Sequence, residues 1–161
     1  MAHLRSERRH DNIPLAALLH ATRGTYTDAV HSAQAKIGYG DIPASGEFIL
    51  SAMGWSDASL ETVIRWLGAT KQAVGQTVET LESRGYLERA RDLSDRRRVN
   101  LVLTDRGRAA ANAARTAIEE VDRKLRDRVG SDSIAHARAT LVALIEVKRE
   151  SLERDRQVSS A

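Results

Sequence analysis

Side chains suited to nucleic-acid binding are concentrated in the middle of the chain. The first group carries hydroxyl, ammonium and amide functions at helical spacing: Thr70, Lys71, Gln72, Gln76 and Thr80. Such groups donate hydrogen bonds to phosphates or read base edges in the major groove of duplex DNA, which is wide enough to admit a helix. A solvated helix face without a ligand is the ordinary alternative, and these residues alone do not decide between the two.

Basic side chains follow directly along the chain. Five arginines fall within ten positions: Arg89, Arg91, Arg96, Arg97 and Arg98. The last three follow Asp95 in an expected turn, where like charges repel one another unless an anion or an acid meets them. A narrow minor groove attracts an inserted arginine. The cluster therefore favours DNA binding, although Arg89 and Arg91 could instead pair with Glu88 or Asp92.

A short helix followed by a two-stranded hairpin is predicted to position these groups. Thr70 is a suitable N-cap, and Gly85 suits the left-handed position that ends a helix. A buried face is expected from the helical repeat of Val74, Thr77, Val78 and Leu81. The pattern of apolar residues predicts strands at residues 87–91 and 99–103, on either side of the expected turn.

Three segments of this region resemble the MarR family of winged helix-turn-helix regulators. Their sequences are LESRGYLER at residues 81–89, DLSDRR at residues 92–97 and LTDRG at residues 103–107. In that family they are the end of the recognition helix, the wing and the start of a dimerisation helix. The resemblance implies a mainly α fold with a small two- to three-stranded β wing, a winged helix-turn-helix core and a helical dimerisation region. It also implies a homodimer that binds a palindromic operator in double-stranded DNA.

The resemblance assigns roles to positions in the recognition helix. Thr70 and Lys71 are expected at phosphates, whereas Gln72 and Gln76 carry amide groups that can read the edge of an adenine. The family commonly has Thr and Arg where this chain has Gly75 and Gln76, so the sequence departs from the family pattern at two contact positions.

The resemblance also assigns roles in the wing. It gives Arg96 to the minor groove and Arg97 to an ion pair with Asp95. Arg98 is an additional charge, so the assignment could shift by one residue. The arginines of the flanking strands, at positions 89 and 91, are expected at phosphates.

Helices are predicted before the recognition helix. An apolar stripe over residues 15–37 predicts a first helix after Pro14. A second helix is expected to end at Gly54. The side chains that should face the core from it are those of Phe48, Ile49, Ala52 and Met53. A short helix at residues 59–67 and a turn at residues 68–69 complete the helix-turn-helix pattern.

Two further helices are predicted after the hairpin. The first has Thr104 as its N-cap and reaches about Val129, with an apolar seam of Ala110, Ala114, Ala117, Val121 and Leu125. After Gly130, the last helix begins at Ser131 or Ser133 and has too large an apolar face to stay exposed. We expect a flexible arm at residues 1–12, a helical dimerisation region at 13–40 and 105–155, a winged helix-turn-helix domain at 41–104 and a polar tail at 156–161.

A small-molecule site is a weaker expectation. The family holds phenolic or aromatic effectors between the dimerisation helices and the winged helix, which suggests as pocket residues Tyr26, His20, Trp55 and Trp66. The aromatic residues could equally belong to the core. A zinc site built on His20 and His31 would need Glu47 or Asp28 as well, and solvated histidines are the default.

Composition narrows the function classes. The chain has 161 residues, 25 basic against 22 acidic, and no cysteine, so disulfides and thiolate metal sites are excluded. No apolar run approaches a membrane span, and no catalytic or cofactor-binding motif is present, so we expect neither an enzyme nor a cofactor. The leading interpretation is a cytoplasmic, dimeric, sequence-specific DNA-binding repressor released by a small molecule. The alternative is an architectural or adaptor winged-helix module without an effector.

Overall fold

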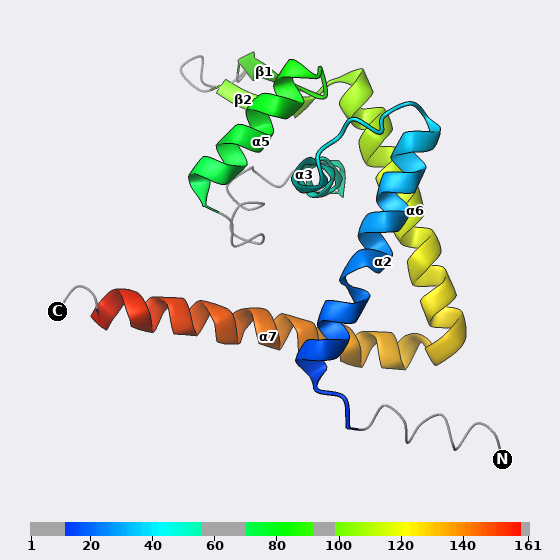
Figure 1. The fold of residues 1–161 in the computed structure, drawn as a ribbon, viewed down its shortest axis with the longest axis vertical. Helices are drawn as coiled ribbons and strands as arrows, with labels where there is room; N and C mark the ends of the chain where they lie inside the picture. Colours follow the sequence, from blue (N-terminus) through cyan, green and yellow to red (C-terminus); the bar gives the residue numbers. More distant parts are fainter. Residues whose placement is uncertain (1–11, 56–69, 92–98, 159–161) are drawn as a thin grey trace. The chain divides into compact units, whose positions relative to one another are not determined.

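The computed structural model describes residues 12–55, 70–91 and 99–158. Its elements in chain order are α2 (Leu15–Lys36), α3 (Ala44–Trp55), α5 (Lys71–Ser83), β1 (Leu87–Arg91), β2 (Val99–Leu103), α6 (Asp105–Val129) and α7 (Ser131–Val158) (Figure 1). The predicted fold class, mainly α with a small β wing, is confirmed. The helix predicted at residues 59–67, the turn at 68–69 and nearly all of the N-terminal arm lie outside the described residues.

Helix α5, the predicted recognition helix, begins and ends where the sequence predicts. The Thr70 side chain accepts a hydrogen bond from the Ala73 N–H at 3.2 Å, which satisfies a donor that has no partner inside the helix. At the other end Gly85 has a φ of +73°, and its N–H bonds the Glu82 carbonyl. The Tyr86 N–H bonds the Leu81 carbonyl, which completes a Schellman motif.

The hairpin follows α5 directly. β1 and β2 are antiparallel, and their register pairs Leu87 with Leu103 and Arg91 with Val99. This confirms the two predicted strands. Residues 92–98, which connect them, lie outside the described part of the chain.

The hydrophobic core joins α3, α5, β1 and α6. Its least exposed members are Ile49, Leu50, Leu81, Tyr86 and Ala110. The buried face predicted for α5 is confirmed, because Val74 and Val78 are also buried. This core fixes α5 by one face and leaves the opposite face uncovered.

Two predictions about α3 are wrong. Phe48 is 45% exposed, because the inward positions of α3 are Gly46, Ile49 and Leu50, which follow helical spacing and leave Phe48 to one side. Gly54 does not end the helix, which continues to Trp55. A Cβ at Gly54 would lie 2.7 Å from that of Ala111, so this glycine allows α3 and α6 to approach closely.

The apolar stripe of α2 is only partly covered. Val30 and Gln34 are the buried residues of this helix, whereas Leu15 is 50% exposed. Gln34 donates a hydrogen bond to the Ala110 carbonyl at 3.3 Å, which joins α2 to α6. Much of the first predicted helix is therefore available for a further contact.

The chain divides into two compact units, residues 1–121 and 122–161. The second contains the end of α6, the break at Gly130 with φ +79°, and α7, all as predicted. The predicted polar tail begins within α7, which continues to Val158. Large apolar side chains remain exposed on this helix: Leu141, Val142, Leu144, Ile145 and Val147. None of the helices in the described residues has an apolar run long enough to cross a membrane.

Candidate DNA-binding site

The exposed face of α5 carries the predicted base-reading groups. Gln72 and Gln76 are exposed one helical turn apart, and Thr80 continues the same stripe at intermediate exposure. Val78 and Leu81 on the opposite face are buried. The two amide side chains therefore project from a helix whose other face is fixed in the core.

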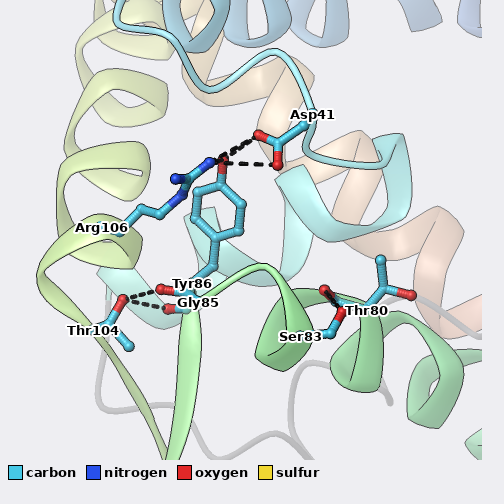
Figure 2. A network of polar contacts seen from close by, with 7 residues as sticks. All are labelled: Asp41, Thr80, Ser83, Gly85, Tyr86, Thr104 and Arg106. Atoms are coloured by element: carbon cyan, nitrogen blue, oxygen red, sulfur yellow. Dashed lines mark hydrogen bonds and ion pairs between the residues drawn. The ribbon is translucent and has the colours of Figure 1, made fainter.

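The hydroxyl groups of α5 are used within the protein. The Thr80 hydroxyl donates to the Gln76 carbonyl at 2.9 Å, so its hydrogen already has an acceptor in the helix. The Thr77 hydroxyl lies 3.0 Å from that of Ser45, which ties α5 to the first turn of α3. Ser83 donates to the Thr80 carbonyl at 2.9 Å near the end of the helix (Figure 2).

Arg89 on β1 forms an ion pair with Glu82 on α5. Its Nε and Nη2 donate to the two carboxylate oxygens of Glu82 at 2.8 and 3.1 Å. These hydrogen bonds raise the pKa of Arg89 above its ordinary value. The partner is therefore Glu82, and the pairing with Glu88 considered from the sequence is wrong. The bidentate pair links α5 to the hairpin at a solvent-exposed position.

The remaining predicted contacts lie at the limit of the described residues. The main chains of Lys71 and Arg91 begin α5 and end β1, but their side chains are outside the described part. The four predicted contacts of the turn are also outside it: Asp95, Arg96, Arg97 and Arg98. Their roles stay predictions.

A polar network that the sequence did not predict lies beneath the end of α5. The Tyr86 hydroxyl donates to Asp41 Oδ1 at 2.5 Å and accepts from Arg106 Nη2 at 2.9 Å (Figure 2). Arg106 Nη2 also lies 3.2 and 3.4 Å from the two Asp41 carboxylate oxygens. The guanidinium carbon is 4.5 Å from the ring centroid of Tyr86 and 4.9 Å from that of Tyr39, which are cation–π distances.

The electrostatics of this network follow from its bonds. The hydrogen bond from Tyr86 lowers the pKa of Asp41. Burial, and then the hydrogen bond to Asp41, raises the pKa of Tyr86. The hydrogen bond to Tyr86 raises the pKa of Arg106. All three shifts favour a charged Asp41 and Arg106 with a neutral Tyr86 between them.

A second close contact joins the hairpin to α6. The Thr104 Oγ1 accepts from the Gly107 N–H at 3.0 Å, which confirms Thr104 as the N-cap of α6. The same oxygen lies 2.6 Å from the Gly85 carbonyl and 3.2 Å from that of Tyr86 (Figure 2). The end of α5, the base of β1 and the first turn of α6 are thus held together by several hydrogen bonds.

The predicted effector residues are only partly within the described residues. Tyr26 and His20 are exposed on α2, while Trp66 and the side chain of Trp55 lie outside the described residues. His31 Nδ1 is 2.8 Å from Glu47 Oε1, a pair that the sequence suggests only as part of a zinc site. Among residues 12–55, 70–91 and 99–158, no three metal-ligating side chains of His, Cys, Asp or Glu type converge.

Solved structures with this fold are winged-helix regulators. CouR from Rhodococcus jostii, bound to p-coumaroyl-CoA, has a TM-score of 0.63 and 22% identity, covering 84% of this chain and 92% of its own. The S. aureus MepR–DNA complex has a TM-score of 0.66 and 17% identity, covering 84% and 99%. A Mycobacterium tuberculosis MarR family protein in complex with salicylic acid has a TM-score of 0.53 and 25% identity, covering 83% and 98%.

The described residues have a winged-helix fold, with α5 followed directly by the hairpin of β1 and β2. No protein-family model matches the sequence, and no curated protein sequence matches it significantly. The similar solved structures give the family at the level of the fold: the chain has the winged-helix fold of the MarR-type transcription regulators. The fold implied by the three sequence segments is thereby confirmed.

Proposed function

We propose that the chain is a DNA-binding transcription regulator whose α5 enters the major groove. The observation that carries the proposal is the division of α5 between a buried face, with Val78 and Leu81, and an exposed face, with Gln72 and Gln76. Paired amide groups can bond adenine edges. The similar fold of MepR, solved as a complex with DNA, supports this assignment.

The wing is the second contact in this proposal. Arg96 enters the minor groove, where negative potential is concentrated, and Asp95 holds Arg97 beside it. Arg98 adds a third positive charge to the same segment. The ion pair between Glu82 and Arg89 supports this role, because it links α5 to the hairpin that bears the wing.

Homodimerisation through residues 13–40 and 105–155 is part of the proposal. On α7, Leu141, Leu144 and Ile145 are 43%, 43% and 60% exposed. Burying one such side chain fully is worth roughly 1.5–3 kcal/mol, so a second copy that covers them gains substantially. A two-fold axis then presents one α5 to each half of a palindromic operator.

Release of DNA by a small aromatic ligand completes the proposal, with the chain as a repressor. Two similar proteins were solved with p-coumaroyl-CoA and with salicylic acid. Tyr26 and His20, on the incompletely covered helix α2, are the described candidates for ligand contact. An architectural module without an effector is the alternative. DNA binding that no aromatic ligand weakens supports that alternative.

Fluorescence anisotropy with a labelled duplex from the promoter upstream of the chain's own gene tests the proposal. The protein is expected to prefer this duplex to a shuffled one. Gln76→Ala should reduce the preference by about 1–3 kcal/mol, the usual worth of one bidentate base contact. Asn12→Ala, which removes an exposed amide outside α5 and outside the proposed dimerisation region, is the matched control and should change nothing. Equal affinity for both duplexes would contradict sequence-specific regulation.

A further inference from the structure

We propose that Arg106 is a positioning residue for DNA binding, acting through Asp41 and Tyr86 to set the orientation of α5. This inference rests on the proposed function and deepens it. Arg106 lies in the first turn of α6, outside the predicted DNA-contacting residues. Its side chain bonds Tyr86, the residue that follows the glycine ending α5 and precedes β1.

Tyr86 is the point at which both DNA-contacting elements are attached. It is fully buried, its N–H bonds the Leu81 carbonyl at the end of α5, and its carbonyl accepts from the Thr104 N–H at 3.1 Å. β1 begins at the next residue, Leu87. A displacement of Tyr86 therefore moves the end of the recognition helix and the base of the wing together.

Arg106 restrains Tyr86 in two directions. Its Nη2 bonds the hydroxyl at 2.9 Å, and its guanidinium stacks against the rings of Tyr86 and Tyr39. These two rings contact each other edge to face, with centroids 5.8 Å apart. Asp41, between α2 and α3, accepts hydrogen bonds from the Tyr86 hydroxyl and from Arg106 Nη2 (Figure 2). Three separate segments thus meet at one phenol.

Because the ion pair of this network is exposed, its loss is expected to affect the orientation of α5 more than the stability of the fold. The side chains of Arg106 and Asp41 are 40% and 44% exposed, and ion pairs of that exposure contribute only about 0–1 kcal/mol to folding. The buried core of α3 and α5 supplies the main stability. Hydrogen bonds to base edges, by contrast, weaken steeply with misalignment. A small rotation of α5 is therefore expected to affect base reading more than folding.

This reasoning predicts a particular binding signature. Phosphate contacts depend on charge and set the salt dependence, whereas base contacts depend on alignment. Loss of the Arg106 network should weaken binding to the operator and leave binding to unrelated DNA, and its salt slope, unchanged. A residue that only stabilised the fold would change neither kind of binding in folded protein.

Arg106→Lys tests the proposal, because it keeps the charge and loses the planar group that stacks and bonds Tyr86. The expected result is a loss of about tenfold in operator affinity, comparable to one misaligned base contact, with unchanged affinity for a shuffled duplex. Arg115→Lys is the matched control, since Arg115 lies on the same helix, is exposed, and bonds Asn112 three residues before it. Tyr86→Phe removes a single oxygen and should show the same signature.

Each outcome decides the matter. If the wild type prefers its operator and Arg106→Lys keeps that preference in full, the positioning role is wrong. It is also wrong if Arg106→Lys loses affinity for the operator and for the shuffled duplex by the same factor. In the double variant with Tyr86→Phe, losses that simply add would also contradict action through the phenol. A wild type without any operator preference would instead overturn the proposed function, and this inference with it.

Discussion

Position 107 in α6 has no room for a side chain, so we expect even Gly107→Ala to destabilise the protein. A Cβ at this position would lie 2.0 Å from the Tyr86 carbonyl oxygen and 3.2 Å from Leu103 Cδ2. Since ordinary contacts begin near 3.4 Å, β1 and α6 would have to separate by about 1.4 Å. That separation weakens the hydrogen bonds from Thr104 to the same carbonyl, at 3.1 and 3.2 Å.

The magnitude follows from opposing effects. Overpacking costs about 1–3 kcal/mol, and a lost hydrogen bond about 1 kcal/mol. Alanine recovers at most about 1 kcal/mol of helix propensity relative to glycine. Gly107→Ala should therefore reduce the free energy of unfolding by about 2 kcal/mol. The steric effect wins because the neighbouring atom is backbone and cannot rotate away.

Guanidinium denaturation at one fixed protein concentration measures this difference, since a dimer's stability depends on concentration. Gly75→Ala in α5 is the matched control: a Cβ there meets nothing within 4 Å. This variant should gain up to about 1 kcal/mol from helix propensity. The two substitutions should thus change stability in opposite directions. A Gly107→Ala protein as stable as the wild type would refute the packing described for the junction of β1 and α6.

Two further predictions concern ionisable groups. His31→Ala should lower the free energy of unfolding by about 1–3 kcal/mol, because the nearly buried Glu47 carboxylate loses its 2.8 Å partner. Urea denaturation measures this free energy. An unchanged value would rule out a structural role for the pair. Because the pKa of Asp41 is lowered in the folded chain, its stabilising contribution is present above its ordinary pKa and disappears as the pH falls below about 4. Thermal unfolding across this range should show a smaller acid-induced loss in Asp41→Asn than in the wild type, and identical curves would contradict the Asp41–Tyr86 bond.

Local signals made the α5 and hairpin region predictable. The Thr70 cap and the left-handed Gly85 each depend on residues only a few positions apart, so the sequence contains the information that defines both ends of α5. The strand pattern at residues 87–91 and 99–103 is local as well. The same holds for the Thr104 cap and the break at Gly130 in the helical region.

Contacts between distant segments could not be predicted in the same way. The sequence around Gly54 is typical of a helix end. Its observed role is to allow close packing against Ala111, which is distant in the sequence. Phe48 is apolar and was expected inside, yet the orientation of α3 is set by its packing against α5. The meeting of Asp41, Tyr86 and Arg106 requires three segments to be in place, and no spacing in the sequence marks it.

The central claim is that paired copies of α5 read two neighbouring segments of one duplex. Hydroxyl-radical footprinting of the protein on its operator tests this most directly. We expect two symmetric protected segments with centres about 10–10.5 base pairs apart, or a multiple of that spacing, as two recognition helices on one face of DNA require. A single protected segment, or uniform protection along the duplex, would contradict it.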